Sequence, residues 1–294
     1  MYTRLHSFLN KNNILFKNQF GFRPGHSTSH ALLNVLDEVY DRLDQGKFAL
    51  GIYLDIQKAF DCINHDILLD KLQTYGIRGV AWRWFQNYLR NRKQFVSVNN
   101  CESSVQNISY GVPQGSVLGP LLFLIYINDI QQATGQSFLN LFADDTSMFL
   151  FDRSVVNLFD KSNKVLESTN NWFKANKLKL SLDKCIYTVF KLAPNKISFS
   201  NYDLCLNGVK LNRVKITKYL GVIIDEDLNW QEHILYVKNK LIKFCSIFYK
   251  LRLKIPHHVL KKFVLCTGLS SPCLLCGNLC QYISKIFRPT NQAQ

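Results

Sequence analysis

The sequence of 294 residues lacks the long apolar stretches that carry a chain into or across a membrane. No apolar segment follows Met1–Arg4, so no secretory signal peptide is expected. The longest apolar run, Leu121–Ile127, is too short to span a bilayer. Low-complexity tracts and internal repeats are also missing. These absences predict an intracellular, globular protein with no membrane partner.

Acidic residues are also few. The chain has 21 Asp and Glu against 36 Lys and Arg, which gives a net charge of +15. Such an excess attracts polyanions and favours a nucleic-acid partner, although a merely basic globular protein has the same charge. Hydrophobic residues make up 47% of the chain, enough for a large core. The nine cysteines of a chain without a secretory signal are expected to be reduced.

Hydrophobic periodicity predicts a mixture of helices and strands. Helices are expected over residues 29–43, 64–75, 80–89, 118–130 and 155–174, and again from about residue 230. Strands are expected over residues 48–55, 95–98, 105–110, 186–190, 204–211 and 219–224, with a hairpin over 138–151. This order predicts an α+β domain followed by a helical C-terminal region.

The hairpin has two adjacent carboxylates, Asp144 and Asp145, at its tip between two aromatic-rich apolar runs. Carboxylates in an apolar setting are costly unless a positive charge holds them, and a divalent metal ion is the usual solution. A solvated turn is the alternative, because Asp is common in turns.

A third acid, Asp55, ends the predicted strand 48–55, and small residues on its side of the strand leave open space. An acid at one strand end and two at a neighbouring hairpin tip can bind two Mg²⁺ ions. Such ions, about 3.5–4 Å apart, assist phosphoryl transfer by activating the attacking oxygen and stabilising the leaving one. The three acids therefore predict a two-metal site.

The sequence resembles the reverse transcriptases of non-LTR (LINE-type, jockey-like) retrotransposons from Gln19 to Leu228. The matching motifs follow the order of that family. They are Gln19–Thr28 in the fingers, Leu54–Asp55 through Leu69 (motif A), Gly111–Pro120 with Ile127–Ile130 (motif B), Phe142–Asp145 (motif C), Asn176–Leu180 with Lys184 (motif D) and Lys218–Val222 (motif E).

The resemblance implies a fold and a role for individual residues. The fold would be the right hand of a polymerase: a palm with an antiparallel sheet and packed helices, fingers, and a helical thumb. Asp55, Asp144 and Asp145 would be catalytic and would bind the metal. The nucleotide-binding residues would be Phe60 as a steric gate, Gln114, Gly115, Arg23, and Lys179 or Lys184, of which one would protonate the leaving pyrophosphate. Tyr219, Leu220 and Gly221 would form the primer grip.

The resemblance also implies an activity and its partners. The chain would be an RNA-directed DNA polymerase that joins dNTPs to a primer 3′-OH on an RNA template, with two Mg²⁺ ions or Mn²⁺ in their place. Its partners would be the RNA template, the DNA primer or target and dNTPs, in a cytoplasmic ribonucleoprotein or in the nucleus; protein partners stay unknown. Residues 1–228 would be palm and fingers incomplete at the N-terminus, and 229–294 a degraded or truncated thumb. The alternatives are a catalytically inactive nucleic-acid-binding remnant and a group II intron maturase.

Four cysteines near the end suggest a different site: Cys266, Cys273, Cys276 and Cys280. One CxxC pair without a second such pair is a weak zinc signal, so incidental thiols are the default interpretation. The same segment departs from the tyrosine- and tryptophan-containing continuation of the family and resembles an out-of-frame ending.

Overall fold

The structure is a computed structural model that describes residues 1–90, 92–191, 199, 201–251, 254–256 and 259. The chain divides into two compact units, one of residues 1–221 with 225–228 and one of residues 222–224 with 229–294. Every residue for which the sequence predicts a catalytic, nucleotide-binding or primer-grip role lies in the first unit. The four cysteines of the zinc hypothesis lie outside the described residues.

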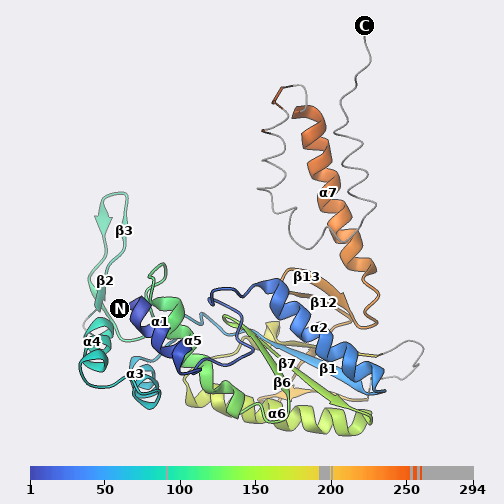
Figure 1. Cartoon of the computed structure of the whole chain (residues 1–294), viewed down its shortest axis with the longest axis horizontal. Coiled ribbons are helices and arrows are strands. Elements are labelled where there is room, and N and C mark those ends of the chain that lie inside the picture. The colour runs from blue at the N-terminus through green and yellow to red at the C-terminus, as the bar shows by residue number, and fades with distance from the viewer. Residues whose placement is uncertain (91, 192–198, 200, 252–253, 257–258, 260–294) are drawn as a thin grey trace. The chain divides into compact units, whose positions relative to one another are not determined.

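The first unit is built on a five-stranded sheet with the strand order β11-β8-β1-β7-β6 (Figure 1). The strands are β1 (Phe48–Leu54), β6 (Phe138–Phe142), β7 (Asp145–Asp152), β8 (Ile186–Phe190) and β11 (Asn212–Arg213). All neighbours are antiparallel except β11 and β8. The antiparallel central sheet confirms the predicted α+β class.

Two long helices cover the two faces of this sheet (Figure 1). On one face, α2 (Thr28–Asp44) packs on β1 and β6, and the amide of Asn140 donates to Ala31 O. On the other face, α6 (Val155–Ala175) packs on β7 and β1, where Thr169 contacts Met148. Because both faces are covered, β1 is buried along nearly its whole length.

The predicted helices form close to their expected bounds, and polar caps explain where three of them begin. Ser27, Asn64 and Ser154 each accept a backbone N–H of the first turn, at the starts of α2, α3 (His65–Thr74) and α6. This unit also contains α1 (Tyr2–Lys11) and α4 (Gly79–Leu89).

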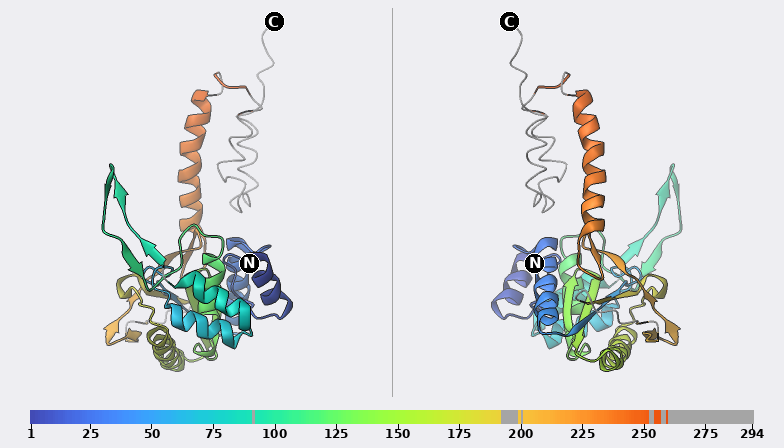
Figure 2. Two further views of the ribbon diagram at one scale, coloured as in Figure 1. Left: turned by 90° about the vertical axis from the view of Figure 1, so that its left-hand side faces the viewer. Right: turned by 90° about the vertical axis from the view of Figure 1, so that its right-hand side faces the viewer.

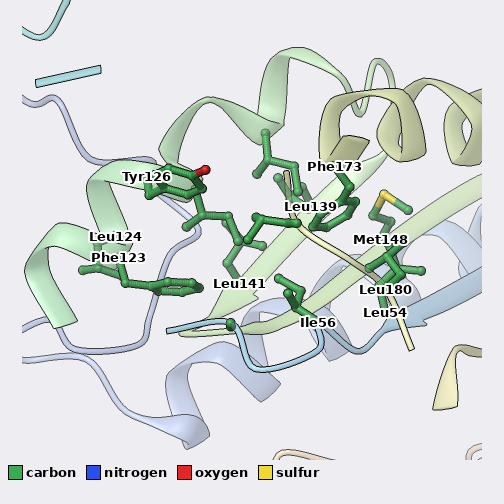
Figure 3. Close-up of a cluster of buried hydrophobic side chains, with 14 of the residues drawn as sticks. Leu54, Ile56, Phe123, Leu124, Tyr126, Leu139, Leu141, Met148, Phe173 and Leu180 are labelled. Atoms are coloured by element: carbon green, nitrogen blue, oxygen red, sulfur yellow. The ribbon is translucent and has the colours of Figure 1, made fainter. Parts of the chain in front are cut away.

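The most apolar stretch of the sequence becomes α5 (Gly119–Ile127), which continues as the 3-10 helix η1 (Asn128–Gln132). Every residue from Leu121 to Ile127 is buried, so this helix is surrounded by protein on all sides. Figure 3 shows Phe123, Leu124 and Tyr126 of α5 among the buried side chains that include Leu54 and Leu141 of the sheet. The core therefore lies directly beneath the strand ends that carry the three acids.

Four of the predicted strands differ from the observed ones, either in their pairing or because a turn divides them. The expected pair 95–98 and 105–110 is instead a ribbon in which β2 (Arg92–Gln94) pairs with β5 (Gln106–Ile108) and β3 (Ser97–Val98) pairs with β4 (Cys101–Glu102). The stretch 204–211 is a hairpin of β9 (Cys205–Leu206) and β10 (Val209–Lys210).

The stretch 219–224 is likewise divided into β12 (Ile216–Tyr219) and β13 (Val222–Asp225). Leu220 and Gly221 separate the two strands, both with positive φ angles of 47° and 88°. A left-handed pair of residues of this kind forms a tight turn, which alternation of apolar residues cannot reveal.

The second unit contains α7 (Gln231–Leu251), in agreement with the helix expected from about residue 230. Lys238, Lys240, Lys243 and Lys250 are exposed on it. Among the residues described, no helix is long and apolar enough to cross a membrane.

Candidate active site

The turn between β6 and β7 presents the paired acids. Asp145 is the first residue of β7 and pairs with Phe142 at the end of β6, so Ala143 and Asp144 form the turn. Ala143 has a φ of 56°, an uncommon left-handed conformation for a residue with a side chain. The hairpin expected from the sequence is confirmed, with the two acids at its tip.

The register between β1 and β7 places the third acid, Asp55, next to this turn. Leu54 of β1 pairs with Thr146 of β7, so the residues just beyond, Asp55 and Asp145, lie at the same edge of two neighbouring strands. The backbone of Asp55 is fixed where its carbonyl accepts Ser181 N at 2.8 Å. Lys184 contacts its carboxylate, with Nζ 3.4 Å from Oδ2.

The charges of Asp144 and Asp55 act on the neighbouring carboxylate of Asp145. Partial loss of solvent raises the pKa of Asp145, and the negative charges of Asp144 and then Asp55 raise it further. A cation held among these groups would remove the repulsion, and carboxylate oxygens are the ligands that hard divalent ions prefer. The donor chemistry therefore fits a divalent metal.

The side chains of the three acids are nevertheless not arranged as a set of metal ligands. Within the described part of the chain, no group of three His, Cys, Asp or Glu side chains is arranged so that it could hold a metal. The acids share one edge of the sheet, while Lys184 lies against Asp55. The metal ligands therefore stay a prediction.

Asp145 gives a testable dependence of stability on pH. A raised native pKa means that ionised Asp145 destabilises the fold; this penalty is absent below the ordinary pKa and appears as pH rises through the raised one. Asp145 is exposed, so solvent screens much of this repulsion. Without divalent ions, Asp145→Asn should therefore raise the melting temperature at pH 7 only slightly, by about one degree or less. The gain should shrink toward pH 4.

Thermal unfolding between pH 4.5 and 8 measures this difference. Asp37→Asn, a change of an exposed acid on α2, is the matched control and should show no such gain. A variant at Asp145 that is less stable than the parent at pH 7 would show that its carboxylate forms favourable contacts instead.

The segment before α2 clamps the acidic turn, a role that the sequence does not reveal. Gln19 is buried, and its Oε1 accepts both Gly21 N at 2.8 Å and Ala143 N at 3.1 Å. Two backbone bonds extend the clamp along β6: Phe20 N donates to Leu141 O, and Leu141 N donates to Asn18 O, each at 2.8 Å. The fingers motif thus holds the backbone of the turn in its left-handed conformation.

Gly21 lies so close to the turn that a side chain would not fit. A Cβ atom at this position would be 2.1 Å from the backbone nitrogen of Ala143 and 2.8 Å from its Cα. Only glycine permits this approach. The sequence shows Gln19 and Gly21 as parts of a motif, but only the structure shows that they position Asp144 and Asp145.

A buried polar network connects the predicted primer grip to the same hairpin. The Tyr219 hydroxyl accepts the Asn140 amide at 2.6 Å and lies 2.8 Å from Ser147 Oγ, on β6 and β7 respectively. Asn34 of α2 donates to Asn140 Oδ1 at 3.2 Å. Burial raises the pKa of Tyr219 to about 12, so its hydroxyl stays protonated. Tyr219 therefore anchors the end of β12, while Leu220 is half-buried and Gly221 is exposed.

The other predicted nucleotide contacts, Phe60, Gln114 and Gly115, differ in how exposed they are. Phe60 is half-buried, 4.7 Å from the ring of Phe123 and 5.9 Å from that of Phe22 between centroids. Gln114 is exposed and donates from Nε2 to Asp61 Oδ1 at 2.9 Å. Gly115 has a φ of 79° with open space around it.

The three cations predicted to bind the nucleotide, Arg23, Lys179 and Lys184, differ in the groups that they contact. Arg23 donates from NH1 to the carbonyls of Phe16 and Gln19 at 3.0 and 3.1 Å, and burial lowers its pKa. Its guanidinium thus supports the clamp. Lys179 and Lys184 are both exposed, and Lys184 contacts Asp55 directly.

A small cavity of about 170 Å³ opens beside the acids. Asp55, Asp145 and Lys184 line it together with residues of β1, β7, β8 and β12, among them Tyr53 and Tyr219. The structure therefore brings motif A, motif C, the motif D lysine and the first part of motif E to one place.

The family model for reverse transcriptase (RNA-dependent DNA polymerase) matches residues 1–224. The chain belongs to this family. The RNA-directed DNA polymerases from mobile element jockey of Drosophila funebris and Drosophila melanogaster are 31% and 30% identical to it over 225 residues. The matches cover 74% of this chain and 24% of each relative. The chain thus spans about a quarter of the relatives' length, and the non-LTR resemblance is confirmed.

Solved structures show the same fold at low identity. Telomerase from Candida tropicalis without ligand has a TM-score of 0.51 at 12% identity, over 77% of this chain and 39% of that one. Telomerase from Candida albicans with a telomeric RNA fragment has a TM-score of 0.50 at 12% identity, over 86% and 43%. The right-hand polymerase fold is therefore confirmed.

Proposed function

We propose that the chain is an RNA-directed DNA polymerase of a non-LTR retrotransposon, which joins dNTPs to a primer 3′-OH on an RNA template. The observation that supports this most is the convergence of Asp55, Asp144 and Asp145 at one edge of β1 and β7. The family uses divalent metal ions, and here these acids would hold two Mg²⁺, or Mn²⁺ in their place. When bound, such ions supply charge stabilisation at the attacking and leaving oxygens.

The residues of the chain would then position the substrates. Phe60 would limit space at the sugar 2′ position, and Gln114 with the open backbone at Gly115 would lie against the incoming nucleotide. Leu220 and Gly221, held by the anchored Tyr219, would support the primer end. Arg23 would act indirectly, because its guanidinium supports the clamp on the turn.

A second candidate function is nucleic-acid binding without catalysis. It is favoured by the absence of a preformed three-ligand metal site among the described residues and by the contact of Lys184 with Asp55. Primer extension on an RNA template with Mg²⁺ separates the two. Incorporation by the parent chain supports the polymerase, whereas RNA binding without incorporation supports the second candidate.

The two candidate lysines of motif D can be separated by rate. We expect Lys184→Met to slow nucleotide incorporation about 10²-fold, the low end of what general acid catalysis contributes, because Lys184 lies at the acids. Lys179→Met should change the rate by less than about threefold, because the lysine that contacts Asp55 among the described residues is Lys184. Single-turnover incorporation of one dNTP measures both.

Equal rates for the two lysine variants would contradict the assignment to Lys184. Lys184→Arg serves as a further control: it keeps the charge next to Asp55 but releases a proton far less readily. If it restores the rate fully, Lys184 acts through its charge and not as an acid.

A further inference from the structure

Trp84, Tyr88 and Arg92 form a row of aromatic and cationic side chains along α4 and the ribbon that follows it. Trp84 is exposed, whereas Tyr88 and Arg92 are half-buried. The rings of Trp84 and Tyr88, one helical turn apart, are stacked with centroids 5.3 Å apart and planes within 9°. The guanidinium of Arg92, in β2, lies over the other end of the row, 5.5 Å from the Tyr88 ring centroid. Trp84 is 38% exposed, although a tryptophan normally buries its large apolar surface.

Buried residues of α4 pack the row against the core. Phe85 is buried and meets the Trp84 ring edge-on at 5.2 Å, and Leu89 is fully buried. Val80, one turn before Trp84, is 75% exposed on the same face of the helix. The helix thus offers solvent an apolar, aromatic stripe whose rings are already ordered.

The segment that carries the stripe has charges of one sign only. Residues 78–93 contain five cations and no acid; the cations are Arg78, Arg83, Arg90, Arg92 and Lys93. All of them are exposed except Arg92, which is half-buried against Tyr88. The acid that contacts this group is Asp66, 3.5 Å from Arg90, in an exposed pair that contributes little attraction. In Figures 1 and 2 the ribbon of β2 and β3 projects away from the sheet beside α4.

A single-stranded nucleic acid is the ligand that matches both properties. Its unpaired bases stack on flat aromatic and guanidinium surfaces, and its phosphates are attracted to the surrounding cations. A duplex has its bases already stacked and hidden, so it could use only the cations. A protein partner would use the apolar stripe but would gain nothing from the excess of positive charge.

We propose that Trp84, Tyr88 and Arg92 form a base-stacking site for single-stranded nucleic acid, with Arg83, Arg90 and Lys93 contacting its phosphates. The site deepens the proposed function, on which it rests, because a template strand is unpaired before it is copied. Its stacking surface lies outside the residues assigned to the acids, the nucleotide or the primer.

Binding of fluorescein-labelled oligo(rU) to the full chain, measured by anisotropy, tests the site. Loss of one stacked base costs about 1–3 kcal/mol, so Trp84→Leu should weaken binding about tenfold. Trp84→Phe keeps a flat ring and should retain most of the affinity. Tyr88→Leu should behave like Trp84→Leu, and a blunt RNA duplex should bind all of these variants alike.

The phosphate contacts can be tested separately through the salt dependence of the binding affinity. Arg83→Gln should lower the slope of log affinity against log salt by about 0.7, the value for one contact to a single strand, while Trp84→Leu should leave the slope unchanged. Oligo(dT) in the same assay shows whether the site distinguishes RNA from DNA; equal effects are expected for stacking alone.

Three results would overturn the proposal. Trp84→Leu could bind oligo(rU) as tightly as the parent does, or it could weaken binding of the duplex as much as binding of oligo(rU). The third such result is that Trp84→Leu abolishes self-association in size exclusion without weakening binding of oligo(rU). Asp144→Ala separates this proposal from the polymerase. Binding that depends on Trp84 in both the parent and Asp144→Ala, without incorporation by the parent, would reject catalysis and keep the stacking site.

Discussion

Replacement of Asp144 by Ala should abolish primer extension while leaving the fold and RNA binding intact. Asp144 lies in the turn at the hairpin tip, and it raises the pKa of Asp145 through its charge. Its removal takes away a proposed metal ligand and relieves repulsion, so no loss of stability is expected. Losing a central catalytic group reduces rates by on the order of 10⁴-fold or more. Single-nucleotide incorporation on an RNA template with Mg²⁺ measures the loss.

Asp183→Ala is the matched control, because it removes an exposed acid in the 3-10 helix η2 (Leu182–Lys184) without changing the hairpin. It should retain incorporation within about threefold, as expected for surface changes that leave catalytic groups in place. Incorporation by Asp144→Ala at the parent rate would reject its role as a metal ligand. Thermal unfolding of both variants shows whether any loss comes from misfolding.

Sequence reasoning located the acids because their chemistry is unusual in its setting. Adjacent carboxylates between two apolar runs, with Asp55 at the end of another apolar strand, leave few physical interpretations. The strand period then implies that residues at strand ends meet at one edge of a sheet, and the pairing of Leu54 with Thr146 confirms it. Helices can be predicted from the sequence for a similar reason, because capping residues and the 3.6-residue periodicity are both local signals.

The supports of the site could not be predicted in this way. Gln19 and Ala143 are 124 residues apart, and Asn140 and Tyr219 are 79 apart, so no local pattern connects them. Nothing in the alternation of apolar residues shows that Tyr219 turns its hydroxyl inward, or that Leu220 and Gly221 interrupt a strand. Tertiary packing decided these features, and it also left Trp84 exposed where helical periodicity would allow a core position.

Gly21→Ala should damage both stability and catalysis, more than any other single methyl group added near the site. The new Cβ would overlap the backbone of Ala143 at 2.1 Å, and backbone cannot move aside as a flexible side chain can. Overpacking of this kind costs about 3 kcal/mol, and relief by shifting the turn would displace Asp144. Denaturant unfolding measures the first effect and single-nucleotide incorporation the second. Gly25→Ala, where the φ of 74° is strained but the space is open, should cost only about 1 kcal/mol and retain activity. If the two variants unfold alike, the close approach of Gly21 to the turn does not restrict the site.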